Sequence, residues 1–111
     1  MHPGAHIKTR KELAHALNCI FDANLYRVLS EPIRVDLIKH LITNGEGDIG
    51  TIAEAFPVDR SVISRHLQKL EEHELLISRR EGRHRYYRVD LDCFIESFEE
   101  SARLLKQLRR R

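Results

Sequence analysis

The fold is decided by residues 58–70, VDRSVISRHLQKL, which form an amphipathic helical pattern. Its inward stripe, at the spacing i, i+4, i+7 that faces a core, consists of Ile63, Leu67 and Leu70. Asp59 is a good N-cap because its carboxylate can accept the backbone N–H groups of the first turn, so the helix should begin at Arg60. The opposite face is then polar and free.

The outward side chains of this helix are of the types that read a major groove. Ser and Gln both donate and accept hydrogen bonds, and Arg can form two bonds to guanine or hold a phosphate. The residues that we expect to contact DNA from this helix are Arg60, Ser61, Ser64, Arg65 and Gln68. An ordinary solvated helix face would have a similar composition, so the neighbouring sequence has to decide.

The preceding segment, residues 51–56, is a short helical run that Pro57 ends, because proline cannot continue a helix. Two short helices joined by a turn of about three residues, with the second exposing polar groups, form a helix-turn-helix. The middle of the chain supplies a further helix, beginning after Ser30 or Glu31 with Pro32 in its first turn, to fill the core.

The following segment predicts a basic hairpin. Residues 75–80 and 85–89 are β-prone and flank residues 81–84, where Gly82 supplies the turn. Such a hairpin after a recognition helix is the wing of a winged helix, and its tip can lie along DNA. The wing residues that we expect to contact DNA are Arg79, Arg83, His84 and Arg85. Arginines on an exposed hairpin can also serve only to discourage edge-to-edge pairing.

Charge and composition agree with a DNA-binding domain. Residues 60–88 contain eight Lys or Arg and four Glu, a net charge of +4, whereas the whole chain carries +2. With 111 residues and a 41% apolar fraction, the chain should form one mainly α domain with a small β-hairpin, an α+β fold. We expect residues 1–8 to be a flexible segment, 9–108 the domain, and 109–111 a basic tail.

The sequence also indicates a location and excludes some functions. There is no apolar run long enough for a membrane span and no signal-peptide core, so we expect a cytoplasmic protein. Two cysteines are too few for a secreted disulfide framework. A glycine-rich phosphate loop and catalytic-triad patterns are missing, which argues against an enzyme or a small-molecule substrate. The alternative to a DNA-binding regulator is a winged-helix protein-interaction module.

Both ends of the chain predict peripheral helices with apolar stripes. Residues 9–12, TRKE, form a capping box that opens the first helix, and Asp90 or Asp92 caps the last one. Such helices leave an apolar surface that a two-fold symmetric partner would cover, unless they pack back on their own subunit. The residues expected in a homodimer interface are Leu13, Leu17, Ile20, Phe94, Phe98, Leu105 and Leu108.

Four segments, residues 25–34, 52–56, 61–70 and 80–89, resemble the ArsR/SmtB family of bacterial winged-helix repressors, a likeness that covers roughly residues 20 to 108. The resemblance implies a homodimer formed through the first and last helices. It further implies a transcriptional repressor that binds an inverted repeat in double-stranded DNA. An effector or thiol oxidation would then release the repressor from its operator.

The sensor sites known in this family are not matched. Residues 47–50, GDIG, replace the cysteine pair of thiolate-binding members, and Arg103, Leu105, Lys106 and Leu108 replace the ligands on the last helix. Our leading hypothesis is a disulfide or persulfide between Cys19 and Cys93. A metal site in which His15 and Cys19 are completed by Cys93, His2 or His6 is the competing hypothesis, and two unrelated thiols are the third.

Overall fold

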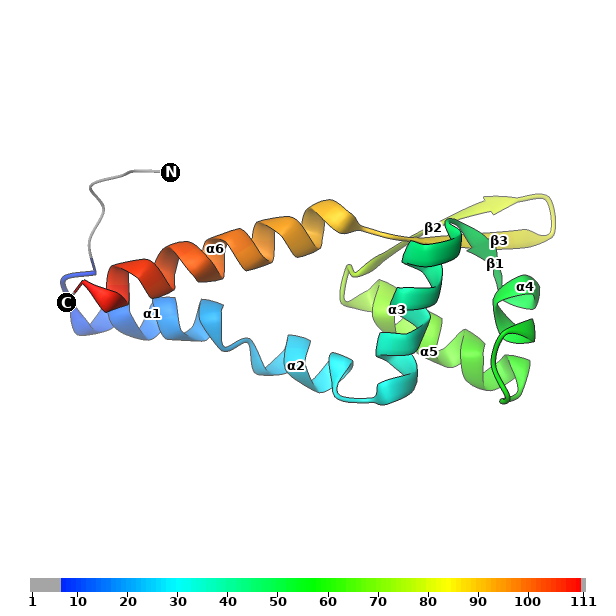
Figure 1. Cartoon of the computed structure of the whole chain (residues 1–111), viewed down its shortest axis with the longest axis horizontal. Coiled ribbons are helices and arrows are strands. Elements are labelled where there is room, and N and C mark those ends of the chain that lie inside the picture. The colour runs from blue at the N-terminus through cyan, green and yellow to red at the C-terminus, as the bar shows by residue number, and fades with distance from the viewer. Residues whose placement is uncertain (1–6, 111) are drawn as a thin grey trace.

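A computed structural model describes residues 7–110, and these form a mainly helical chain with one small sheet (Figure 1). The helices are α1 (Arg10–Ile20), α2 (Ala23–Leu29), α3 (Pro32–Asn44), α4 (Ile49–Glu54), α5 (Arg60–Glu72) and α6 (Leu91–Arg109). The strands are β1 (Gly47–Asp48), β2 (Leu76–Glu81) and β3 (His84–Val89). None of the helices in the described range is long and apolar enough to cross a membrane.

We call the unit from α2 to β3 the body, and it holds the main core. The side chains of Leu37, Ile52, Ile63 and Leu67 are fully buried there, and Tyr87 from the sheet is 1% exposed. The predicted stripe of α5 is therefore the central layer of the core, between α3, α4 and the sheet. The expected winged helix-turn-helix is confirmed.

The sheet is larger than the hairpin that the sequence predicts. The strand order is β1-β3-β2, both pairs are antiparallel, and Gly47 lies opposite Tyr87 in the added strand. Gly82 adopts a left-handed φ of 62° in the tight turn between β2 and β3, a conformation that glycine tolerates without a Cβ penalty. The two-residue β1 is a product of tertiary pairing and has no pattern of its own.

Four other expectations about the elements need correction. Helix α4 begins at Ile49 rather than at residue 51, because the Asp48 side chain accepts a hydrogen bond from Thr51 N and caps it. It ends at Glu54, so the turn to α5 spans residues 55–59 and is longer than expected. Helix α2, capped by the Asp22 side chain, was not predicted. Helix α6 extends to Arg109, within the expected tail.

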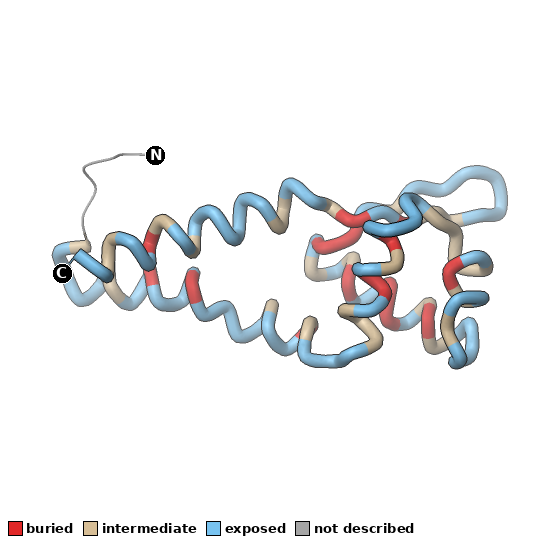
Figure 2. Tube along the Cα trace, viewed as in Figure 1, coloured by how far each residue is buried: buried red, intermediate tan, exposed pale blue. Residues whose placement is uncertain are grey.

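We call α1 together with α6 the arm. Figure 1 shows the two helices running side by side away from the body, with the start of α1 and the end of α6 at the far tip. Their shared core consists of Ala16, Ile20 and Leu104, and Figure 2 shows that most of the remaining arm is exposed. The radius of gyration is 17.4 Å, whereas a compact domain of this length has about 13 Å. The arm accounts for this elongation.

The ends of the two terminal helices follow the predicted capping rules. Thr9 Oγ1 accepts from Glu12 N at 3.0 Å, and Glu12 Oε2 accepts from Lys8 N at 2.7 Å. The capping box therefore reaches one residue further back than its usual form. Asp90, not Asp92, caps α6 by accepting from Cys93 N. Most of the segment predicted to be flexible, and residue 111 of the basic tail, lie outside the described residues.

Candidate nucleic-acid interface

Helix α5 presents one apolar and one polar face, as predicted. Ile63, Leu67 and Leu70 are fully buried, which fixes the rotation of the helix about its axis. Among the predicted contact residues, Arg60, Ser61, Arg65 and Gln68 are exposed and Ser64 is half-buried. The polar face is thus available to a ligand along most of its length, and which of these residues touch DNA stays a prediction.

The start of α5 differs from the expectation in one respect. Asp59 occupies the N-cap position, but its carboxylate makes no capping hydrogen bond. Its backbone carbonyl instead accepts from Val62 N at 3.0 Å and Ile63 N at 3.1 Å. The first turn is therefore held by backbone bonds, without a hydrogen bond from the helix to the carboxylate.

The wing extends from the end of the body at which α5 begins, on the side opposite the arm (Figure 1). In the β2–β3 register Arg80 lies directly opposite Arg85, so two guanidinium groups share one face of the hairpin. Like charges directly opposite each other in a sheet repel. Arg83 is exposed in the turn, and neither it nor Arg80 forms an ion pair within residues 7–110. An anion such as a phosphate would relieve this concentration of positive charge.

Arg79, in contrast, is already held by the protein. Its guanidinium donates to Glu46 Oε1 from Nη2 at 2.7 Å and to Glu81 Oε2 from Nη1 at 2.8 Å, and it lies 4.6 Å from the centre of the Tyr86 ring. The hydrogen bond from Arg79 lowers the pKa of Glu46, and the two carboxylates raise the pKa of Arg79. Arg79 therefore ties the wing to the loop before β1. Sequence reasoning missed Glu46 because it lies 33 positions from Arg79.

Two other predicted wing contacts also have partners in the chain. His84 Nδ1 is 3.1 Å from Asp48 Oδ2, and Arg85 Nη1 donates to Ser78 Oγ at 2.9 Å. Hydrogen bonds from Thr51, and then the bond from His84, hold the pKa of Asp48 below its usual value. Asp48 therefore joins the wing to the start of α4. Tyr86 and Tyr87 are neighbours on β3 and face opposite sides of the sheet, with Tyr87 in the core.

The predicted interface residues of the arm fall into two groups. Leu17, Phe98 and Leu105 are 38%, 63% and 49% exposed and leave apolar surface of the arm open to solvent. Leu13, Phe94 and Leu108 are half-buried, and Ile20 is buried within the chain against Ala16 and Leu104. Sequence reasoning missed Leu104, although Leu108 of the predicted set packs against the same cluster.

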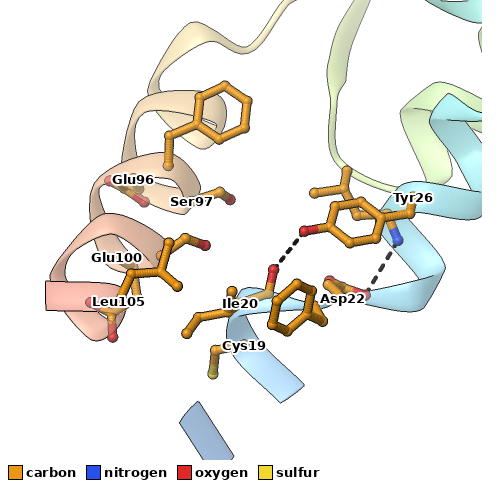
Figure 3. Close-up of a pocket in the computed structure, with 12 residues that line it drawn as sticks. Cys19, Ile20, Asp22, Tyr26, Glu96, Ser97, Glu100 and Leu105 are labelled. Carbon is orange, nitrogen blue, oxygen red and sulfur yellow. Dashed lines mark hydrogen bonds between the residues drawn. The ribbon is translucent and has the colours of Figure 1, made fainter. Parts of the chain in front are cut away.

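A groove of about 560 Å³ separates α6 from the junction of α1 and α2. Figure 3 shows Ser97 and Leu105 of α6 on one side of it and Ile20 and Tyr26 on the other. The Tyr26 hydroxyl donates to Ile20 O at 2.7 Å and joins α2 to the end of α1. The walls of the groove are mostly apolar and open to solvent.

The two cysteines lie in different surroundings within one chain. Cys19 is exposed beside the groove, with its Sγ 3.7 Å from His15 Nε2. Cys93 is half-buried and packs against the core of the body, where burial and then the charges of Asp90 and Glu74 raise the pKa of its thiol. Cys93 is therefore the weaker nucleophile expected of a buried thiol.

The geometry also bears on the metal hypothesis. His15 and Cys19 are adjacent on α1, but Cys93 lines a separate pocket on the body side of α6. His2 and His6 lie outside the described residues. Within residues 7–110, no group of three or more His, Cys, Asp or Glu side chains is placed to hold a metal ion.

Comparisons with known proteins agree with this architecture. A family model described as a helix-turn-helix domain matches residues 29–79. The transcriptional repressor SdpR of Bacillus subtilis (strain 168) is 31% identical over 74 residues, which is 67% of this chain and 81% of that protein. The crystal structure of a possible transcriptional regulator for arsenical resistance is 35% identical, covers 77% of this chain and 83% of its own, and superposes with a TM-score of 0.60.

A third relative is described as a homodimer. It is the winged helix-turn-helix DNA-binding domain of a possible ArsR-family regulator from Mycobacterium bovis, solved in solution. It is 28% identical, covers 95% of this chain and 86% of its own, and has a TM-score of 0.58.

Proposed function

The chain belongs to the ArsR/SmtB family of winged-helix transcriptional regulators and is a DNA-binding transcriptional regulator, and from that premise we propose that it acts as a homodimeric repressor on an inverted-repeat operator in the cytoplasm. The family is generally not enzymatic. Membership of the chain in this family makes the alternative, a winged-helix protein-interaction module, the weaker one. The exposed polar face of α5 and the basic wing are features of a DNA-binding protein.

The observation that carries the proposal is the exposed polar face of α5 beside a wing with like charges facing each other. Ser61, Arg65 and Gln68 would read base edges, because they are exposed and have suitable donors and acceptors. Arg80 and Arg83 would bind phosphates, because neither has an ion-pair partner among the described residues. Arg79 brings Tyr86 and Glu46 together, so its role would be to fix the angle of the wing.

The arm supports the dimeric half of the proposal. Its exposed Phe98 and Leu105 form a surface that a second copy would cover, and the relative from Mycobacterium bovis is described as homodimeric. Two-fold symmetry would then set the two α5 helices about 34 Å apart, one turn of DNA. A change in the angle between the arms would misalign one helix when the other is seated.

Selection of bound duplexes from a random library tests the proposal. We expect recovery of an inverted repeat with half-sites about one helical turn apart. Arg65→Ala should relax the choice of one base pair by about 1–3 kcal/mol, whereas Arg83→Ala should weaken all duplexes alike and reduce the salt dependence by about one phosphate contact. Recovery of a single half-site, or binding insensitive to salt, would contradict the proposal.

For the effector step we propose a disulfide that joins two subunits, from Cys19 of one protomer to Cys93 of the partner subunit. Cys19 is exposed, and within one chain the two thiols line different pockets, so a link across the dimer suits them better. A peroxide would remove two electrons and two protons from the two thiols. A dimer band on a non-reducing gel, lost in both Cys19→Ser and Cys93→Ser, is the expected result, and release of DNA by peroxide in either variant would contradict it.

A further inference from the structure

Arg34, near the start of α3, joins three elements with one side chain. Its Nε donates to His66 Nδ1 of the recognition helix at 3.1 Å, and its Nη1 donates to Val28 O of α2 at 3.2 Å. Its Nη2 also lies 3.7 Å from Glu31 Oε1. Because α2 follows directly after the arm and α5 carries the proposed DNA-reading face, Arg34 connects the part of the body next to the arm with that face.

His66 is the buried polar residue of the described chain, with 8% exposure, on the inner side of α5 next to Arg65. It cannot touch DNA from this position. An imidazole nitrogen accepts a hydrogen bond only with its lone pair free, so Nδ1 must be unprotonated for the bond from Arg34 to exist. The histidine is therefore neutral with its proton on Nε2, which lies 4.0 Å from Glu31 Oε2.

Protonation of His66 would place an N–H against the guanidinium of Arg34. The charged groups facing the ring are Arg34 and Glu31 from the α3 side and Arg65 from its own helix. Burial is the main cause of the lowered pKa of His66, the two arginines lower it further, and Glu31 opposes them. Arg27 of α2 and His73 at the end of α5 line the adjacent pocket with Arg34. The surroundings are thus built for a neutral ring.

We propose that Arg34 is a positioning residue that locks α5 to the α2–α3 corner through neutral His66, and that protonation of His66 opens this lock and weakens DNA binding. The inference rests on the proposed function, because it concerns the pose of the DNA-reading helix. The acid-sensitive element is inside the body and separate from the thiols of the arm. DNA affinity therefore falls on acidification, although exposed histidines gain positive charge under the same conditions.

The test compares wild type with His66→Asn, whose Oδ1 replaces Nδ1 as an acceptor and cannot be protonated. Anisotropy of a fluorescein-labelled duplex from the selection is measured from about pH 7.5 to about pH 5 at fixed ionic strength. The dissociation constant of the wild type should rise on the order of tenfold more than that of His66→Asn, the size expected for a hydrogen bond to a charged group. Superimposed pH profiles would overturn the proposal.

Two further variants separate the lock from general effects. His73→Asn removes an imidazole from the end of the same helix and should keep the wild-type pH profile. Arg34→Lys keeps the charge but loses the planar donor group, so it should bind more weakly at about pH 7.5 and respond less to acid. An Arg34→Lys variant identical to wild type at both ends of the range would contradict the assignment.

Urea unfolding without DNA keeps the inference separate from the proposed function. The unfolded imidazole titrates near 6.5, whereas the folded one has a lower pKa, so the unfolded state binds more protons below that pH. The free energy of unfolding should therefore fall as pH drops below about 6.5, and fall less in His66→Asn. Equal losses of unfolding free energy in the wild type and His66→Asn would overturn the lock even where DNA binding is intact. A larger loss in the wild type would support it even if no duplex were bound.

Discussion

The body and the arm are built from similar amphipathic helices, but only the body completes its core within one chain. In the body the apolar stripe of α5 is fully buried against α3, α4 and the sheet. In the arm the buried residues are Ala16, Ile20 and Leu104, while Phe98 and Leu105 on α6 remain about half exposed or more. Burial inside one chain therefore distinguishes the body, whose core is complete, from the arm, whose exposed face we propose is covered by a second copy.

The largest expected effect is on dimer formation, and it is tested by placing one charge on the arm and one on the body. Phe98→Glu puts a carboxylate on the exposed face of α6, where a dimer would have to desolvate it. We expect the dimer dissociation constant to rise by a factor on the order of a thousand or more, measured by sedimentation. Ile42→Glu is the matched control, because Ile42 is 54% exposed on α3 of the body. Equal loss of dimer in both variants would contradict the proposal that the arm, and not the body, forms the dimer interface.

The next effect concerns stability and its dependence on concentration. Leu67→Ala should cost about 3 kcal/mol of unfolding free energy, because it leaves a cavity in the body core. That cost should be the same at every protein concentration. Leu105→Ala, on the arm, should cost less and change the apparent stability in a concentration-dependent way, because it weakens association. Urea unfolding at two protein concentrations would show the difference, and a concentration-independent loss in Leu105→Ala would count against the dimer.

The smallest expected effect is a gain in the free energy of unfolding from one substitution in the body. Among residues 7–110, Glu74 is the one non-glycine residue with a positive φ, 62°, and it lies just after α5, where Leu75 N donates to Leu70 O and closes the helix end. Glu74→Gly should raise the unfolding free energy by about 1 kcal/mol, because glycine adopts this conformation without strain. Glu72→Gly, at the last residue of α5, should lower it instead, because glycine disfavours the helical conformation. Thermal melts compare the two, and a loss in both would show that φ is not the cause.

The sequence was sufficient for the parts that local rules govern. The spacing of Ile63, Leu67 and Leu70 predicted the buried face of α5, and Gly82 marked the turn of the wing. The family resemblance placed the chain among DNA-binding regulators, and the comparisons confirm it. In these regions propensity, spacing and capping all favour the same structure.

The missed features depend on contacts between distant residues. Strand β1 exists because Gly47 pairs with Tyr87, and Arg79 is held by Glu46 far away in the sequence. Helix α2 was missed because no proline or glycine separates it from α1, and Asp22 was the available signal. Charge counting treated all arginines of the wing alike, although only the fold determines which of them have partners.

The mass of the wild-type protein in solution shows whether two chains associate through the arm. Each chain weighs 13.0 kDa, and light scattering at micromolar concentration, with and without a duplex from the selection, gives the number of chains in each particle. Two chains per particle are expected in both conditions. A particle of one chain, with the helices of the arm still formed and the duplex still bound, would contradict it.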